Sequence, residues 1–195
     1  MHPLRANILV ISGAFAFAAM PLPAQNLVTN PGFDANLDDW SMILGSASWS
    51  SDDCCGNANS GSASLAVIVG GTVMMNSACI GVTPGASYDL VVLAETLAIP
   101  PDFLSGLGTA TVTWYDDIAS CPNVLVSEPG VTFQPDTGWR QFGATFVAPA
   151  TAAAVKVTLM AQAGGLSQAI DVHFDNVRFG PTGSVPVTLQ SFEVD

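Results

Sequence analysis

The sequence predicts an all-β protein, folded as an antiparallel β-sandwich or jelly roll. Apolar residues recur mainly with period two, helical periodicity is nearly absent, and Gly-, Pro- and Asn-containing turns separate the apolar runs at regular intervals. The pattern gives about eight or nine short strands. That number suits two packed antiparallel sheets in one domain.

Three longer strands are expected in the first half of the chain, after a short opening strand. Range 62–70 follows a loop rich in Gly, Ser and Asn, 74–82 ends at the turn TPGAS, and 88–96 precedes a loop rich in Pro and Gly. Ahead of them, the apolar run at 26–28 is expected to open the sandwich as a short strand.

The clearest alternation lies at 109–117. It predicts an apolar face with Ala110, Val112 and Trp114, and a threonine-rich face with Thr109, Thr111, Thr113 and Tyr115. The later strands are expected at 131–133, 139–149, 153–162 and 169–179. In 139–149 the spacing of Trp139, Phe142 and Phe146 breaks strict alternation and predicts a bulge.

Residues 1–24 resemble a secretory signal peptide, with a basic start, a short apolar run and a cleavage site after Ala24. The alternative is a membrane anchor that is retained. Residues 25–180 then form the sandwich, and 181–195 form a tail or an edge strand. After residue 24 no run is long and apolar enough to span a membrane. We expect a secreted bacterial protein, periplasmic or extracellular.

The charge of the chain disfavours two classes of partner. Four Lys and Arg residues stand against sixteen Asp and Glu, for a formal net charge of −12. Loss of the signal peptide removes Arg5 and no acid, which leaves −13. Such a surface repels nucleic acid and anionic lipid, and it suits uncharged partners and divalent cations.

All four cysteines follow the signal peptide, and an oxidising compartment makes disulfides their expected state. Four cysteines allow three pairings, of which we favour Cys79 with Cys121. Cys54 and Cys55 then form a strained vicinal pair, or remain as free or intermolecular thiols. Their spacing resembles no zinc knuckle, because His173 is the one histidine after the signal peptide and lies far away in sequence.

Six segments carry a resemblance to a known family. They are NLVTNPGFDANLDDW, SGSASLAV, VTPGASYDLVVLAE, TATVTWYD, TGWRQFGATFVAPATAAAVKVTL and VHFDNVRF. In their order the chain resembles bacterial carbohydrate-binding modules of the jelly-roll, galactose-binding-like type, and most closely the group with families four, nine and twenty-two. The resemblance covers the mature chain to about Phe179. It implies a module that binds a poly- or oligosaccharide.

The resemblance also implies a structural calcium ion. In such modules an acid after the first strand and an acid in the last strand hold the ion together with backbone carbonyls, and the matching residues here are Asp34 and Asp175. Calcium takes roughly six to eight oxygen ligands, which such a mixed set supplies. The alternative is that Asp34 caps a turn and Asp175 is solvated.

Two aromatic residues are candidates for sugar stacking. Tyr115 lies on the threonine-rich face, and Trp49 lies in a polar loop without an obvious core partner. For both, partial packing is the alternative. Trp40 and Trp139 match packing positions of the family, and Trp114 belongs to the predicted core. Among polar strand residues, Glu95, Gln162 and Lys156 could complete a ligand-binding groove or remain solvated.

The sequence gives little basis for an enzyme. His173 shares a strand face with Asp171 and Asp175, but no Gly-x-Ser-x-Gly elbow supplies a nucleophile, and we expect a half-exposed histidine. The Asp-Asp pairs at 38–39, 52–53 and 116–117 are explained by solvated loops, and no phosphate loop or dinucleotide fingerprint is present.

Two functions from different classes fit these observations. The first is a secreted, non-catalytic module that recognises a neutral poly- or oligosaccharide. The second is a structural or adhesive extracellular protein with the same fold and no sugar binding. The adjacent cysteines and the alternating tail at 185–195 would let that second protein self-associate.

Overall fold

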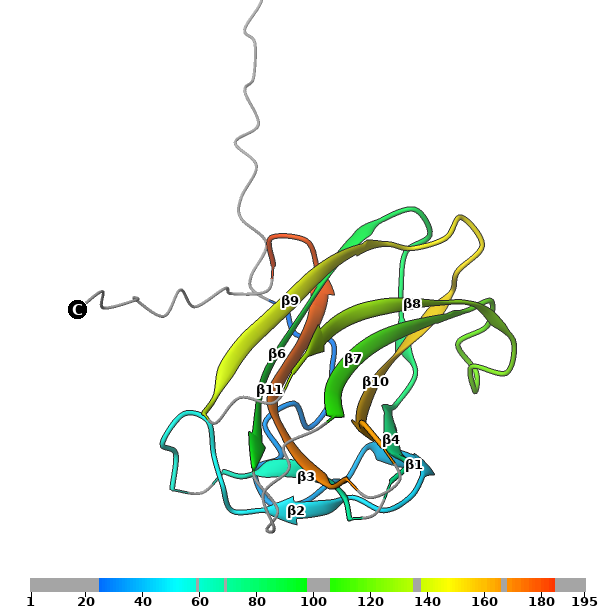
Figure 1. The fold of residues 1–195 in the computed structure, drawn as a ribbon. Coiled ribbons are helices and arrows are strands. Elements are labelled where there is room, and N and C mark those ends of the chain that lie inside the picture. Colours follow the sequence, from blue (N-terminus) through cyan, green and yellow to red (C-terminus); the bar gives the residue numbers. More distant parts are fainter. Residues whose placement is uncertain are drawn as a thin grey trace, which may run out of the picture.

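The computed structural model describes residues 25–58, 60–68, 70–97, 106–134, 138–165 and 168–184, and in them the predicted all-β sandwich is confirmed. The predicted signal peptide and most of the predicted tail lie outside the described residues. Within the described ranges, no helix is long and apolar enough to cross a membrane. Two antiparallel sheets face each other across the core (Figure 1).

We name the two sheets A and B. Sheet A contains, in spatial order, β1 (Trp40–Leu44), β4 (Thr72–Ser77), β10 (Ala154–Ala163), β7 (Gly106–Tyr115) and β8 (Val124–Phe133), with β5 (Ile80–Gly81) also paired to β10. Sheet B contains β2 (Ser48–Ser50), β3 (Ser62–Val67), β11 (Ile170–Pro181), β6 (Ser87–Leu97) and β9 (Arg140–Val147). Sequence neighbours are divided between the sheets, so segments far apart in the chain lie side by side.

The core follows from the period-two alternation. Ala110, Val112 and Trp114 of β7 are fully buried between the sheets, as predicted. From sheet B, Tyr88 and Phe179 stack at 5.2 Å between ring centroids, and the edge of Trp114 meets Phe179 at 6.3 Å. Such offset and edge-to-face contacts add to the free energy gained from burying the rings.

Strand β11 is central in sheet B and sets the position of the polar side chains described below. It pairs with β3 as far as Phe174 and with β6 along most of its length. The register shifts between Asp175 and Arg178, where Asn176 has a φ of 48°. Such a bulge redirects side chains and ends pairing locally. Beyond it, the segment at 26–31 replaces β3 as neighbour, through Val177 N to Pro31 O and Leu27 N to Phe179 O.

The predicted opening strand at 26–28 is wrong. Of the backbone hydrogen bonds between described residues, a single one joins 26–28 to β11, from Leu27 N to Phe179 O, and Phe179 N donates to the Asn26 side chain, so no strand ladder forms. Positive φ values at Asn30 and Phe33 then turn the chain. The bulge predicted within 139–149 is also wrong, because β9 pairs with β6 without a register shift and Trp139 precedes the strand. Phe142 and Phe146 simply share the inner face.

Other differences concern strand number and length. Strands β1 and β2 are not predicted from the sequence, and β8 begins at Val124, well before the predicted 131–133. The shift of register around the Pro-Gly pair of β8 hides its alternation. Strand β11 continues to Pro181, one residue past the predicted boundary of the sandwich.

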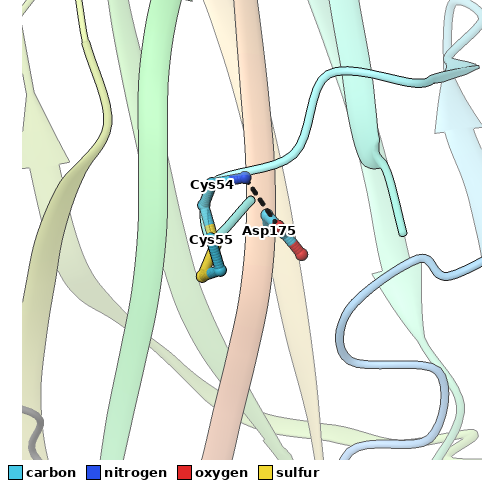
Figure 2. Close-up of side chains that lie close together, drawn as sticks. All are labelled: Cys54, Cys55 and Asp175. Atoms are coloured by element: carbon cyan, nitrogen blue, oxygen red, sulfur yellow. Dashed lines mark hydrogen bonds between the residues drawn. A yellow bond between two sulfur atoms is a disulfide. The ribbon is translucent and has the colours of Figure 1, made fainter. Parts of the chain in front are cut away.

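The predicted disulfide is confirmed. Cys79, which follows β4, is bonded to Cys121, which lies in the connection between β7 and β8. Of the two alternatives for the other pair, the structure has the vicinal disulfide Cys54–Cys55. This bond lies in the loop that follows β2 and crosses β11 on the outside of sheet B (Figure 2).

Candidate functional site

A cluster of acceptor groups surrounds His173 on the outer face of sheet B. Glu95 of β6 stands directly opposite His173 in the ladder, and Asp52 reaches the same point from the loop after β2. His173 Nδ1 lies 3.7 Å from Asp52 Oδ2 and 4.0 Å from Glu95 Oε1. We call Asp52, Glu95 and His173 the histidine cluster.

The other side of the imidazole faces a carboxylate. His173 Nε2 lies 3.3 Å from Asp171 Oδ2, and the second oxygen of Asp171 accepts a hydrogen bond from Ser64 Oγ at 2.9 Å. Ser62 Oγ lies 3.2 Å from His173 Nδ1. Alternation along β3 and β11 places all of these side chains on one face of sheet B.

His173 is 3% exposed, so the expectation of a half-exposed histidine is wrong. The loop that brings Asp52 covers it, and the ring of Trp139 lies 6.5 Å from its ring. Glu95 is also buried, and its Oε1 atom has no hydrogen-bond partner in the described part of the chain. Burial, with the hydrogen bond and the charge of Asp52, raises the pKa of Glu95 to about 7.

A second group of oxygens gathers around Gly32. A Cβ atom on Gly32 would lie 3.3 Å from Asp34 Oδ1 and 3.8 Å from Asp175 Oδ1. Ser60 Oγ donates to Gly32 O at 3.0 Å and to Asp34 Oδ1 at 3.2 Å. The structure therefore brings together the two acids that the resemblance implies for calcium. Burial raises the pKa of Asp175 to about 7, with a further rise from Asp53.

The loop with the vicinal disulfide is fixed to β11. Cys54 N donates to Asp175 Oδ2 at 3.2 Å, and Figure 2 shows this bond between the loop and the strand beneath it. Asp53 accepts hydrogen bonds from the backbone N–H groups of Cys55 and Asn57, which closes the loop on itself. The interpretation of Asp52 and Asp53 as merely solvated is therefore wrong.

Sheet A presents a different surface on its outer face. Hydroxyl and amide side chains follow one another across β4, β10, β7 and β8, and we call them the polar band: Asn76, Thr158, Thr111, Thr113 and Ser127. Thr158 Oγ1 donates to Asn76 Oδ1 at 2.6 Å, and the Thr113 and Ser127 hydroxyls lie 2.8 Å apart. Met74 and Met160, opposite each other, provide partly exposed apolar surface beside the band.

Gln162 extends the same face toward one end of sheet A. It is exposed and lines a hollow of about 360 Å³ together with Gly106, Leu107, Ala163 and Gly164. Lys156 shares this face, as predicted, and its Nζ lies 5.6 Å from the centre of the Tyr115 ring. The polar band therefore ends in a hollow at one end and near a lysine at the other.

The four residues predicted to bind ligand do not form one site. Trp49 and Glu95 belong to sheet B, whereas Tyr115 and Gln162 belong to sheet A. Tyr115 pairs with Ala154 and Gln162 with Leu107, so about eight residues of β10, roughly 26 Å, separate them.

The two predicted stacking residues have packing contacts. Tyr115 is 7% exposed and packs with Cys121, Ala154 and Cys79, so its ring is not presented to a ligand. Trp49 is 40% exposed, stands opposite the core residue Ala63, and donates from Nε1 to Phe33 O at 2.7 Å. Packing is therefore the better interpretation of Tyr115, and Trp49 is an edge residue that keeps one exposed part.

The other tryptophans follow the expectation of packing. Trp40 and Trp114 are buried in the core, and Trp139 is half-buried against His173.

Sequence reasoning missed Asp52 and Ser62 as neighbours of His173. The available signal was the shared face of Asp171, His173 and Asp175, which indicates a polar cluster but not what covers it.

Comparison with protein-family models finds no match, and comparison with curated proteins also finds none. Solved structures do match. The first, the enzymatically active domain of tailspike protein 4 of bacteriophage CBA120, has a TM-score of 0.63 at 16% identity over 80% of this chain. This chain spans 21% of the length of that solved chain.

Two further matches are isolated modules. A family 16 carbohydrate-binding module has a TM-score of 0.57 at 18% identity, with 80% of this chain and 99% of that one covered. The C-terminal family 22 carbohydrate-binding module of Clostridium thermocellum Xyn10B has a TM-score of 0.53 at 15% identity, with 84% and 100% covered. The chain therefore has the β-sandwich fold of the carbohydrate-binding modules that its sequence resembles.

Proposed function

We propose that this chain is a secreted, non-catalytic protein that binds an uncharged poly- or oligosaccharide on the outer face of sheet A. The polar band carries the proposal. Its hydroxyl and amide groups offer both donors and acceptors, which sugar hydroxyls require, and Met74 and Met160 offer apolar surface for the C–H face of a pyranose. Gln162, at the end of the band, is proposed as a further contact.

The absence of catalysis is supported by the surroundings of the histidine. Ser62 Oγ lies beside His173, but Ser62 is fully buried in β3, so a substrate carbonyl cannot approach its hydroxyl in this arrangement. The disulfides fit an oxidising compartment, which supports secretion. The net charge of −12 favours a neutral ligand over a polyanionic one.

A glycan array with neutral and acidic polysaccharides tests the proposal. We expect a neutral glycan to bind, and Gln162→Ala and Thr113→Ala to weaken binding. Gln141→Ala is the matched control, because Gln141 is an exposed glutamine on the outer face of sheet B, opposite Leu93. Equal loss in the control, or no binding by the folded protein to any glycan, would contradict the proposal.

Calcium between Asp34 and Asp175 is proposed as the structural ion of this protein. The residues fit the ion: two carboxylate oxygens, the Gly32 carbonyl and the Ser60 hydroxyl lie around one point, and all are oxygen donors. Burial opposes ionisation of Asp175, so a cation there would offset that cost. The ion would tie the segment at 32–34 to β11. Chelation should lower the melting temperature, and should do so less in Asp34→Asn.

Self-association is a second candidate, favoured by one surface. Val124, Leu125 and Val126 of β8 are 59%, 38% and 40% exposed, and β8 is an edge strand of sheet A. Unpaired edges with apolar side chains promote strand pairing between molecules. Sizing across a concentration series distinguishes the candidates, because a glycan-binding monomer keeps one hydrodynamic radius. Leu125→Lys should abolish any concentration-dependent assembly.

A further inference from the structure

The histidine cluster lies outside the polar band and has a fixed orientation. Ser64 bonds to one oxygen of Asp171, and the other oxygen faces His173 Nε2 at 3.3 Å. An ionised carboxylate only accepts, so this contact assigns a hydrogen to Nε2 and leaves Nδ1 as the ring atom that could bind a metal ion. Metal-bound histidines commonly have such a carboxylate on the nitrogen that does not bind the ion.

Two carboxylates lie on the Nδ1 side of the ring, beside the Ser62 hydroxyl at 3.2 Å. One oxygen of Asp52, one of Glu95 and Nδ1 all lie within 4.8 Å of one another. Glu95 Oε1 is buried and has no hydrogen-bond partner among the described residues, although it lies 4.0 Å from Nδ1. An unpaired buried acceptor destabilises the folded state, and more so when it is charged. A cation between the three atoms would remove this penalty.

The donor set selects the kind of cation. Two carboxylates and one imidazole suit first-row divalent metals, whereas calcium and magnesium prefer oxygen ligands alone. Zinc binds nitrogen and carboxylate oxygen at roughly 2.0–2.2 Å, which places the ligands of a tetrahedral site about 3.4 Å apart. The present separations of 3.7 and 4.0 Å need to shorten by only a few tenths of an ångström.

We propose that Asp52, Glu95 and His173 bind one divalent transition-metal ion of the zinc type, with Asp171 orienting the imidazole. Three protein ligands leave one position of a tetrahedral ion for water or another small ligand. The side chain of Asp52 is 44% exposed, whereas those of His173 and Glu95 are 4% and 8% exposed. The ion therefore enters from the side of Asp52, and its free position faces the same side.

This site is distinct from the proposed calcium site. The oxygens around Gly32 include no nitrogen ligand, whereas the histidine cluster depends on one. The two sites are nevertheless neighbours, since His173 and Asp175 alternate on the same face of β11, roughly 7 Å apart along the strand. A zinc titration must therefore be done with calcium present in excess.

The test is a calorimetric zinc titration of the full chain, stripped of metal and then saturated with calcium. We expect one zinc ion per chain, and at least about tenfold weaker binding in Asp52→Asn, Glu95→Gln and Asp171→Asn. Asp52→Asn changes a largely exposed side chain, so this variant tests the site even if Glu95→Gln folds poorly.

Asp39→Asn is the charge-matched control. Asp39 is exposed, lies before β1 of sheet A, and has a φ of 68°, which asparagine tolerates well. It should bind zinc like the wild type. A second readout locates the ion: Ni²⁺ should quench the fluorescence of Trp139, whose ring lies 6.5 Å from that of His173, and Trp139→Phe should lose most of this quenching.

Three results would overturn the proposal. The first is the absence of zinc binding by the folded, calcium-loaded protein. The second is unchanged zinc affinity in both Asp52→Asn and Asp171→Asn, which would place any bound zinc elsewhere. The third is zinc that displaces calcium one for one and whose affinity falls in Asp34→Asn as much as in Asp52→Asn. Zinc would then occupy the oxygen site around Gly32.

Discussion

Glu95 stands directly opposite His173 in the ladder between β6 and β11, and its Oε1 atom lies 4.0 Å from the imidazole Nδ1. Both side chains point away from the core, yet both are buried, because the loop that follows β2 crosses over them. An outer sheet face that is covered in this way holds ionisable groups at low solvent access. The protonation state of these groups is therefore linked to the stability of the fold.

The first prediction concerns pH in the presence of a chelator. The pKa of Glu95 rises from 4.5 to about 7 on folding and that of Asp175 from 3.8 to about 7. Between these values the folded chain holds protons that the unfolded chain has lost, so the free energy of unfolding decreases as pH rises from about 4 to about 7. Urea unfolding at a series of pH values measures this slope.

The variant Glu95→Gln tests whether Glu95 causes this decrease in the free energy of unfolding with pH. It cannot ionise, so it should lose the part of the pH dependence due to Glu95 and should be more stable than the wild type at pH 8 without cations. The groups facing Glu95 are Asp52, His173 and Asp171. A wild-type stability that stays constant or increases over this pH range would contradict the prediction. Bound cations should weaken the slope, because they require ionised ligands.

The second prediction concerns the hydrogen bond between sheet A strands β7 and β8. Trp114 is fully buried and its Nε1 donates to Glu128 Oε1 at 2.7 Å. Glu128→Ala leaves a buried N–H group unpaired and should lower the free energy of unfolding by about 1–3 kcal/mol. Glu128→Gln keeps an acceptor and should lose less. Equal stabilities of the two variants in urea titration would show that the bond contributes little.

The third prediction concerns Gly61, which lies against strand β2. A Cβ atom there would collide with the Ser50 carbonyl and would lie 2.6 Å from Cε2 of Trp49. Gly61→Ala should therefore destabilise the protein by about 1–3 kcal/mol and change the fluorescence of Trp49. In the control Gly165→Ala the nearest atom, Gln168 Oε1, lies at 3.3 Å on a flexible side chain. The control should keep both stability and spectrum.

The fourth prediction compares the two disulfides. The Cys79–Cys121 bond joins residues 42 apart, so replacing both cysteines by serine should cost about 3–4 kcal/mol, because the unfolded chain gains freedom. The Cys54–Cys55 bond joins adjacent residues and restricts almost no loop. Its double serine variant should unfold at nearly the same denaturant concentration, but should bind zinc more weakly, since its loop carries Asp52. The opposite ranking of stabilities would contradict this prediction.

Most of the fold could be predicted because alternation reports which side of a strand is buried. Range 109–117 gave the correct inner residues, Ala110, Val112 and Trp114. Strand β1 was missed because it is an edge strand. Its consecutive apolar residues Met42, Ile43 and Leu44 remain 41–51% exposed, so apolar and polar side chains do not alternate in the sequence there. The bulges of β8 and β11 were hidden for a related reason, since an inserted residue shifts the alternation.

The site was predictable only in part. Alternation places Asp171, His173 and Asp175 on one face, and the structure confirms that face. The arrival of Asp52 depends on a loop whose bond to the strand, Cys54 N to Asp175, joins residues 121 apart in sequence. Short-range patterns carry no information about such a contact. The sequence also could not show that Tyr115 is covered by the Cys79–Cys121 connection.

The loop that follows β2 has a thermodynamic consequence. It supplies Asp52 to the histidine cluster and the Cys54 N–H to Asp175, so both proposed cations act on the same few residues. Whichever ion binds first reduces the conformational entropy of that loop, and the second ion then meets a loop already ordered. Two divalent ions roughly 7 Å apart also repel each other, so the ordering of the loop and the repulsion of the charges act in opposite directions. Coupling between two sites is reciprocal, so calcium changes zinc affinity by the same factor as zinc changes calcium affinity. One short loop would thus couple the binding of two chemically different ions.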